Sequence, residues 1–402
     1  MSEAVASRVE PGGSDLRVER VRILPLTLPI AQPLRYTQGR VGAFQRIVVE
    51  LSTADGLVGY GECRGDQLRY ALLSGLAGSL TGLDPYRLET LRWRIAPQGL
   101  VELFSGTVAV QAFSAIEMAC LDLIGKATGR PVSDLLGGRV RDEVEIAGYL
   151  YYSDQAGEDE LLAQARDFVE SHGFTTLKYK CGVLDPSEEM RTLRRLREEF
   201  PAHGLRIDPN GAWGVSTSLR MLAVARETGV EYVEDPAATL AKNARIRQQA
   251  PGVALASNQA VASLETLALD EAFGAIDIPL IDLNWYGGFR AGVLAGRMAE
   301  LLGRDVGLHS SMETAISQSA QLQLAACLAN LPYASDSHYP YLLDDVAEPL
   351  TITGGRMTVP SGPGLGVDVD PDRLEALHRS WQETGFLSWD DPSGAPVPLP
   401  RW

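Results

Sequence analysis

Cysteine is scarce in this sequence, with four residues among 402, and the scarcity excludes two kinds of site. The wide and irregular spacing of Cys63, Cys120, Cys181 and Cys327 fits neither a zinc site nor a disulfide framework. We therefore expect four reduced thiols, most of them packing residues, in a protein of the cytoplasm.

Long runs of one residue class are also missing. No apolar stretch reaches the roughly 18 residues that a membrane-spanning helix needs, so no segment is predicted to cross a membrane. No long basic run occurs, and the formal net charge is −16, so nucleic acid is not expected as a partner. Residues 1–16 lack the basic start and apolar core of a signal peptide and are predicted to be a short disordered lead.

No glycine-rich phosphate loop opens any predicted helix, which disfavours a nucleotide-binding fold. The composition is otherwise that of an ordinary globular protein, with 45% hydrophobic and 22% charged residues. A chain of 402 residues is too long for one simple core and predicts two domains, or one barrel with a cap.

The first third of the chain, residues 17–140, is predicted to be a small α+β unit. Two β-like runs, VERVRILPLTL and FQRIVVELST, are followed by a turn signal at Asp55-Gly56. Apolar residues at helical spacing then predict helices in LRYALLSGLAGSL and AIEMACLDLIGKATG.

The pattern of predicted elements changes at residue 141, and the new pattern continues to residue 352. Eight β-like runs alternate with amphipathic helices, which predicts a parallel barrel, with a doubly wound open sheet as the alternative. The runs are EVEIAGYLYY, TTLKYK, LRIDPN, VEYVEDP, GVALASN, AIDIPLIDLN, DVGLHSS and YASDSHY. Residues 353–402 read as a hairpin and a turn, followed by a proline-rich tail that is expected to pack across another domain.

Polar residues stand at the carboxyl ends of seven consecutive predicted strands, about 24 to 30 residues apart, close to the length of one strand plus one helix. A closed barrel brings all such ends to one mouth, where barrel enzymes place their chemistry. Each one alone is more simply a helix cap or a turn former, but the whole set indicates a site. The residues are Lys178, Lys180, Asp208, Asn210, Glu234, Asp235, Asn258, Asp282, His309, Asp336 and His338.

Three of these residues predict a magnesium site. Asp208, Glu234 and Asn258 offer oxygen ligands, which Mg²⁺ prefers, with positions left open for water and substrate. The metal would neutralise the enolate that forms when a proton leaves the carbon next to a carboxylate.

Two other residues are candidate bases for that step. Lys180 can act as a base if its pKa is lowered by neighbouring charge, which Lys178 and the metal supply. His309 follows Asp282 by one strand, and the aspartate is placed to orient the imidazole ring and raise its basicity. A cation and two bases are what proton abstraction from a weak carbon acid requires.

At this point the chain resembles the enolase superfamily, in its mandelate racemase-like branch and the glucarate dehydratase group. The motifs are SAIEMACLDLIGKATGRPVSDLLGG at the junction of the two units, LKYK, IDPNGAW, VEDP, LASNQ, DIPLID, GLHSS and ASDSHY. Asn258 in LASNQ is characteristic of that group, where the superfamily more often has an acid.

The resemblance implies a fold, a cofactor and further site residues. The fold is α/β: a modified (β/α)₇β TIM-type barrel with an α+β N-terminal capping domain, which the C-terminal tail completes. Magnesium, a small carboxylate substrate and a homo-oligomer of the chain are expected. Tyr149, Asp336, His338, Asn210 and Phe104 fall on substrate-contacting positions of the family.

Three positions depart from the glucarate dehydratase group. Arg40 replaces a histidine, Leu103 a threonine and Ser311 an asparagine. Arg40 is therefore a candidate to grip a distal carboxylate, although a solvated loop arginine is the equal alternative. We expect another sugar acid to be a better substrate than D-glucarate.

The predicted reaction is dehydration of an acid sugar, an aldarate or aldonate, by loss of the α-proton and the β-hydroxyl in carbohydrate catabolism. The alternative is a racemase or epimerase of a 2-hydroxy acid that uses the same lysine and histidine. A barrel that binds a ligand without catalysis is disfavoured because every catalytic group is present.

Overall fold

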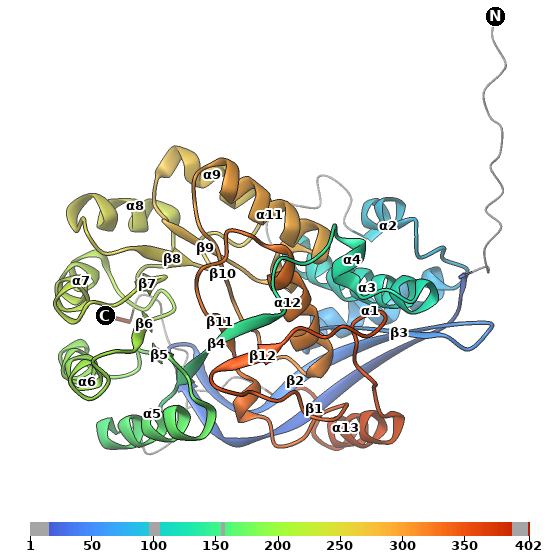
Figure 1. Cartoon of the computed structure of the whole chain (residues 1–402), viewed down its shortest axis with the longest axis horizontal. Coiled ribbons are helices and arrows are strands. Elements are labelled where there is room, and N and C mark those ends of the chain that lie inside the picture. Colours follow the sequence, from blue (N-terminus) through green and yellow to red (C-terminus); the bar gives the residue numbers. More distant parts are fainter. Residues whose placement is uncertain (1–15, 96–104, 154–156, 388–400) are drawn as a thin grey trace, which may run out of the picture.

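The N-terminal unit is a three-stranded antiparallel sheet with helices packed against it. The computed structural model describes residues 16–95, 105–153, 157–387 and 401–402. The sheet order is β1-β2-β3 (Figure 1). The elements are β1 (Val18–Tyr36), β2 (Gly39–Thr53), β3 (Val58–Arg64), α1 (Gln67–Leu80), α2 (Leu88–Ile95), α3 (Ser105–Thr128) and α4 (Val132–Leu135).

Glycines in β3 let helix α3 approach the sheet closely. A Cβ at Gly61 would lie 1.9 Å from the carbonyl oxygen of Ala115, and one at Gly59 would lie 2.3 Å from that of Ala119. Helix α3 also contains the one window in the described chain that is long and apolar enough to cross a membrane, Val108–Thr128, and 89% of that window is buried inside the fold. The apolar character of this window is therefore explained by its place in the core of the fold.

All eight strands predicted after residue 141 are present, and helices connect them. The order of elements is that of a (β/α)₇β barrel, as expected. The strands are β4 (Glu143–Leu150), β5 (Thr176–Lys180), β6 (Gly204–Asp208), β7 (Tyr232–Glu234), β8 (Leu255–Ser257), β9 (Ile278–Ile281), β10 (Gly307–Leu308) and β11 (Ser335–Ser337). The helices are α5 (Glu158–His172), α6 (Pro186–Glu199), α7 (Val215–Thr228), α8 (Leu240–Gln249), α9 (Leu264–Phe273), α10 (Leu283–Tyr286), α11 (Phe289–Leu301) and α12 (Ala315–Cys327).

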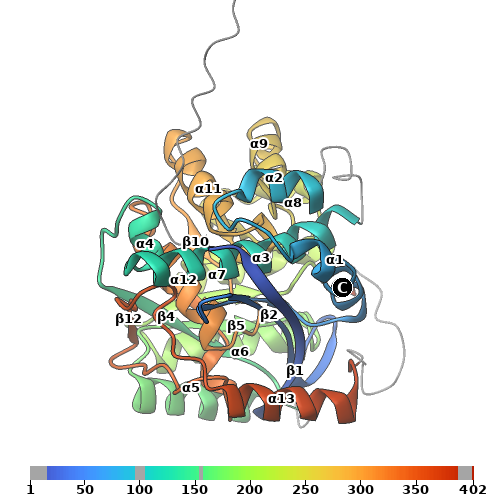
Figure 2. The same cartoon turned by 90° about the vertical axis from the view of Figure 1, so that its right-hand side faces the viewer.

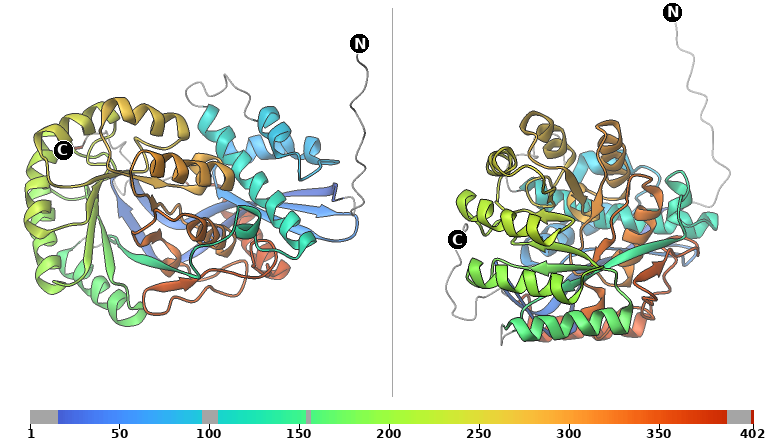
Figure 3. Two further views of the ribbon diagram at one scale, coloured as in Figure 1. Left: turned by 45° about the horizontal axis from the view of Figure 1, so that its top comes forward. Right: turned by 60° about the vertical axis from the view of Figure 1, so that its left-hand side comes forward.

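The parallel strands pair in the order β10-β9-β8-β7-β6-β5-β4-β11. The sheet curls until its two end strands, β10 and β11, contact one another. The helices form an arc outside the strands, whereas the antiparallel sheet and α3 lie at the other side (Figure 3). A closed barrel is therefore confirmed over the open doubly wound sheet.

The C-terminal part contacts first the barrel and then the N-terminal unit. Strand β12 (Arg356–Thr358) pairs with the first residues of β4, Glu143–Glu145, because β5 pairs only with the last part of that strand. The predicted turn is present, because the backbones of Thr353 and Arg356 exchange hydrogen bonds, and the strand that follows it, β12, adds to the barrel sheet. Helix α13 (Pro371–Thr384) then packs along β1 (Figure 2). The predicted domain boundaries stay predictions.

Two further predictions concern the ends of the chain. Of the predicted lead, residues 1–16, only Leu16 is among the described residues, and it is buried. In the proline-rich tail, the amides of Arg401 and Trp402 both donate to the carbonyl of Ala212, in the loop after β6. The tail therefore ends on the barrel.

Candidate active site

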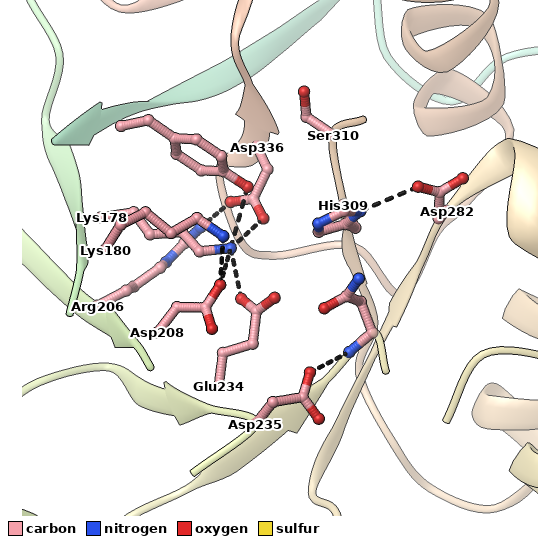
Figure 4. Close-up of polar contacts among 12 residues, drawn as sticks. Lys178, Lys180, Arg206, Asp208, Glu234, Asp235, Asp282, His309, Ser310 and Asp336 are labelled. Atoms are coloured by element: carbon pink, nitrogen blue, oxygen red, sulfur yellow. Dashed lines mark hydrogen bonds and ion pairs between the residues drawn. The ribbon is translucent and has the colours of Figure 1, made fainter. Parts of the chain in front are cut away.

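The polar residues at the strand ends converge at one mouth of the barrel, as predicted (Figure 4). Lys180, Asp208 and Glu234 are the last residues of β5, β6 and β7. Asn258, Asp282 and His309 directly follow β8, β9 and β10. Strand pairing aligns these ends, for example by placing Lys180 opposite Asp208.

Lys178 lies at the centre of a buried cluster of carboxylates. Its ammonium donates to Asp336 at 2.5 Å and to the hydroxyl of Tyr149 at 3.0 Å, and it forms an ion pair with Glu234. Burial alone would lower the pKa of Lys178, but the carboxylates of Asp336 and Glu234 more than reverse this and raise it. Lys178 is therefore a fixed cation beneath the site and not a base.

The charged cluster continues below Lys178. The guanidinium of Arg206 lies 3.6 Å from Asp336 and donates to Glu231 and to the carbonyl of Ala334, both at 2.7 Å. Asp336 is thus held between two cations, Lys178 and Arg206.

Lys180 reaches a cavity of about 220 Å³ at the mouth of the barrel. Its ammonium donates to Asp208. Among the other predicted site residues, Asn210, Asn258, His309 and His338 also line this cavity.

His309 is oriented by Asp282, as predicted. Its Nδ1 lies 2.9 Å from Oδ2 of Asp282, and Oδ1 of the same carboxylate accepts the amides of Asn284 and Trp285 at 2.8 and 3.0 Å. The hydroxyl of Ser311 also donates to Asp282. Although burial opposes ionisation, the bond from His309 and these donors lower the pKa of Asp282. An ionised aspartate holds the proton on Nδ1 and leaves Nε2 as the basic nitrogen.

The predicted metal ligands form an oxygen-rich group. Burial raises the pKa of Glu234, and the nearby Asp208 raises it further, so a cation between the two carboxylates would relieve their repulsion. One end of the Asn258 amide lies 2.9 Å from Oε1 of Glu234. Adjacent oxygen ligands of an octahedral Mg²⁺ are about 2.9 Å apart, given Mg–O distances near 2.05 Å.

These residues therefore fit Mg²⁺ if the amide oxygen of Asn258 faces Glu234. In the described part of the chain no three His, Cys, Asp or Glu side chains gather to hold a metal ion by themselves. The amide of Asn258 and oxygens from substrate or water complete such a site.

Asp235 fixes the position of Asn258. Its carboxylate accepts the backbone amides of Asn258 and Gln259 at 3.0 and 3.1 Å and the hydroxyl of Ser257 at 2.5 Å. The backbone of Asp235 is left-handed, with φ 38°, which non-glycine residues seldom adopt. The strain indicates that the loop geometry is tightly determined.

His338 belongs to a hydrogen-bonded chain that the sequence did not reveal. Ser310 donates to Glu313 at 2.5 Å, so its oxygen accepts from Nδ1 of His338 at 2.7 Å. Nε2 of His338 is then free to accept from the hydroxyl of Tyr151 at 2.6 Å. Burial lowers the pKa of His338 well below its ordinary range, and Lys180 adds to this effect. The ring is therefore neutral.

Three predicted substrate contacts do not line this cavity, and a fourth stays a prediction. Tyr149 and Asp336 are described residues that do not line the cavity, because both lie beneath it against Lys178. Arg40 is also absent from the lining, whereas Arg64 is present. Phe104, like Leu103, lies outside the described residues.

Tyr151, Arg64 and Trp285 line the cavity without having been predicted. Tyr151 had a signal, because it stands two residues after Tyr149 and so on the same face of an extended chain.

Two family models match the chain in succession. The mandelate racemase / muconate lactonizing enzyme N-terminal domain matches residues 19–137, and the enolase C-terminal domain-like model matches residues 160–373. The stretch between the two matches, residues 138–159, contains β4.

Individual proteins resemble the chain over nearly its whole length. A probable glucarate dehydratase from Streptomyces coelicolor is 38% identical, over 96% of this chain and 97% of the relative. A chloromuconate cycloisomerase from Cupriavidus pinatubonensis is 30% identical, over 87% of this chain and 96% of the relative.

Solved structures agree with these matches. An enolase from Mycobacterium smegmatis complexed with tartrate has a TM-score of 0.90 and 35% identity, over 96% of this chain and 98% of that one. An enolase from Gibberella zeae complexed with magnesium, formate and sulfate has a TM-score of 0.90 and 32% identity, with the same coverage. The chain therefore belongs to the enolase superfamily, in its mandelate racemase / muconate lactonizing enzyme branch.

Proposed function

We propose that the protein is a Mg²⁺-dependent hydro-lyase that dehydrates an acid sugar. The observation that carries this proposal is the placement of Lys180 and His309 in one cavity. They come from β5 and β10, and the strands that end in Asp208, Glu234 and Asn258 lie between them in the sheet. Two bases therefore flank a group of metal ligands.

Lys180 and His309 carry out the proton transfers of this reaction. Lys180 or His309 removes the α-proton, depending on the configuration at that carbon, because they reach it from different strands. His309 then gives a proton to the departing β-hydroxyl. That proton is the one His309 took from the α-carbon or, where Lys180 is the base, one that His309 already carries as an imidazolium beside the ionised Asp282. Loss of water and tautomerisation leave a 2-keto-3-deoxy acid. Lys178 remains protonated throughout and adds positive charge beneath the site.

Asp208, Glu234 and Asn258 would hold the magnesium ion. When bound, Mg²⁺ supplies the positive charge that stabilises the enolate form of the carboxylate. The relatives support the metal and the substrate class, since one neighbour holds magnesium and formate and another holds tartrate, a small dihydroxy diacid. The probable glucarate dehydratase supports dehydration.

The experiment is a screen of sugar acids with Mg²⁺, read by the formation of 2-keto acids. We expect at least one acid with an α-hydroxyl and a β-hydroxyl to be dehydrated, and another acid to exceed D-glucarate in kcat/KM. If no acid in a broad stereochemical set yields a keto acid, the dehydratase proposal is wrong.

Racemisation or epimerisation of a 2-hydroxy acid is the second candidate. The same placement of two bases at one cavity favours it, because a proton removed by one base can be returned by the other. The two reactions differ in the fate of the β-hydroxyl. Incorporation of deuterium at the α-carbon without loss of water would identify this second reaction.

The proposal also covers the cellular location, the metabolic role and the assembly of the enzyme. We propose that it works in the cytoplasm, in the catabolism of acid sugars, as an assembly of identical chains. The four cysteines support the location, because all are buried and none forms a disulfide.

A further inference from the structure

The turn that follows His309 lies against the N-terminal unit as well as the barrel. It spans residues 310–314 and joins β10 to α12, and α12 packs against β3 of the N-terminal sheet. Met312, at the centre of the turn, has a left-handed backbone with φ 70°. A non-glycine residue rarely adopts this conformation, which persists only where the surrounding contacts hold it. The contacts that hold this turn therefore influence the position of His309.

Two buried residues of the N-terminal sheet make such contacts. Arg46, on β2, donates from Nη1 to the carbonyl oxygen of Ser311 at 2.7 Å. Glu62, on β3, accepts the backbone amide of Thr314 at 3.0 Å and also the hydroxyl of that residue. Arg46 and Glu62 form an ion pair with each other, and both side chains are fully buried. The N-terminal unit thus holds the turn at two points.

The turn also contributes a hydrogen bond to the pair formed by Asp282 and His309. The hydroxyl of Ser311 donates to Oδ2 of Asp282, and the same oxygen lies 2.9 Å from Nδ1 of His309. Ser311 is therefore bonded to Arg46 through its carbonyl and to Asp282 through its hydroxyl. These bonds form a continuous path from the N-terminal sheet to the proposed base.

The surroundings of Arg46 keep its guanidinium charged. Burial alone would lower the pKa of Arg46, but the carboxylates of Glu62 and Glu313 more than reverse this and raise it. Glu313 lies within the turn, where it accepts the hydroxyl of Ser310 at 2.5 Å and the amide of Ser311. A guanidinium has five donors in a fixed plane, so one arginine can bind a carboxylate and a carbonyl at the same time.

We propose that Arg46 is a positioning residue for His309. By holding Ser311 it fixes the carboxylate of Asp282 against Nδ1, so the placement of His309 at the α-carbon depends on the N-terminal unit. Lys180 stands on β5, across the metal ligands from this turn. Loss of Arg46 should therefore impair His309 and spare Lys180. This inference rests on the proposed function, since it takes His309 and Lys180 as the two bases.

The test measures α-proton exchange in D₂O by NMR, with Mg²⁺ present, for two acids of opposite configuration at the α-carbon. One acid presents its proton to His309 and the other to Lys180. Arg46→Met should slow exchange through His309 by about ten- to a hundredfold, because a misplacement of about 1 Å can cost about a hundredfold in rate. Exchange through Lys180 should stay close to that of the wild type.

Two further variants separate positioning from a general loss of stability. Arg46→Met combined with Glu62→Gln leaves no unpaired charge at position 62, so it should recover part of the melting temperature lost in Arg46→Met but none of the exchange through His309. Lys126→Met is the matched control. Lys126 belongs to the same unit and pairs with the buried Asp122 at 2.7 Å. Its loss should lower the melting temperature but leave the ratio of the two exchange rates unchanged.

A double-mutant cycle tests whether Arg46 acts through Ser311. Ser311→Ala keeps the carbonyl that Arg46 binds but removes the hydroxyl that binds Asp282. If both substitutions break one path, their effects on exchange through His309 should not add in the double variant. Additive effects would overturn the proposed path.

The outcomes distinguish this inference from the function on which it rests. If the wild type exchanges the α-proton of no acid, the proposed function fails. Hydrogen exchange of the backbone amides of residues 310–314 then decides the inference, because it needs no substrate; it should quicken in Arg46→Met and not in Lys126→Met. Unchanged amide exchange in this turn overturns the inference, and so does equal slowing of α-proton exchange through His309 and through Lys180.

Discussion

The side-chain amide of Asn258 joins the proposed base His309 to the predicted metal ligand Glu234. One end of the amide lies 3.2 Å from Nε2 of His309, and the other lies 2.9 Å from Oε1 of Glu234. If the oxygen faces Glu234 and a cation, the amide nitrogen donates to Nε2. If the nitrogen faces Glu234, the oxygen accepts a proton from Nε2 instead. An aspartate at this position has no donor for Nε2.

We therefore expect Asn258→Asp to keep magnesium binding but to lose activity. The new carboxylate adds a metal ligand, yet it draws a proton onto Nε2 of His309 and so blocks that nitrogen as a base. Turnover that starts from His309 should fall by at least tenfold, an effect of about 1.4 kcal/mol, whereas the thermal shift caused by Mg²⁺ should persist. Steady-state kinetics and thermal melts with and without Mg²⁺ check this; unchanged kcat would contradict it.

Removal of the metal should abolish catalysis and lower stability. EDTA should stop turnover, and Mg²⁺ should restore it. Because a ligand that binds only the folded state stabilises it, Mg²⁺ at a hundred times its Kd should add about 2.7 kcal/mol to the free energy of unfolding. Glu234→Gln should reduce this gain. Full activity after exhaustive chelation would refute the metal assignment.

The two lysines of β5 should respond differently to substitution by methionine. Lys178→Met removes the cation between Asp336 and Glu234, so the free energy of unfolding should fall by about 3–5 kcal/mol. Lys180→Met should leave stability closer to that of the wild type but stop α-proton exchange on the lysine face, while exchange through His309 persists. Chemical denaturation and NMR of substrate in D₂O measure the two effects. Equal stability of the two variants would refute this division of roles.

Much of the barrel was predictable because its signals are local. Each strand end carries its polar residue in a short motif, and the barrel geometry alone then brings Lys180, Asp208 and His309 together. The residues that the N-terminal unit contributes to the cavity were harder to predict from the sequence. Arg64 reaches the cavity because β3 pairs with β2 over the barrel mouth, and no local pattern distinguishes it from Arg40.

Long-range pairing also explains the other differences. Asp336 was predicted to contact the substrate because it stands at a strand end. Its carboxylate instead lies beneath the cavity, between the two buried cations Lys178 and Arg206. The chain from Glu313 through Ser310 to His338 joins residues from two strand ends, which periodicity does not relate. A sequence pattern indicates which face of a strand or helix is buried. It does not indicate which other part of the chain packs against that face.

The four cysteines should resist alkylation in the folded protein. Burial raises the pKa of Cys63 and of Cys327 to about 11 and raises those of Cys120 and Cys181 as well. A raised pKa keeps each group as a neutral thiol at pH 8, and only the thiolate reacts rapidly. Mass spectrometry after iodoacetamide treatment should find no modification in buffer and four modifications in denaturant. Rapid labelling of the folded protein would contradict the burial.

Thr37 should act as a latch between the β1–β2 hairpin and the catalytic loops. Its hydroxyl donates to the carbonyl of Pro209 at 2.9 Å and lies 3.3 Å from that of Cys181, in the loops that follow Asp208 and Lys180. Gly182 allows the close approach, because a Cβ there would lie 2.7 Å from the Thr37 hydroxyl. The latch places Tyr36 and Gln38, its neighbours in the chain, on the cavity wall.

Thr37→Val keeps the shape of the side chain but removes the hydroxyl, whereas Thr37→Ser keeps the hydroxyl. Losing this buried hydrogen bond should cost about 1–2 kcal/mol, so Thr37→Val should raise KM by about five- to thirtyfold with a smaller change in kcat, because the hairpin is less often closed. Thr37→Ser should stay near wild type, and hydrogen exchange in the hairpin should quicken in the valine variant alone. If the two variants behave alike in KM and in exchange, the hydroxyl does not hold the hairpin.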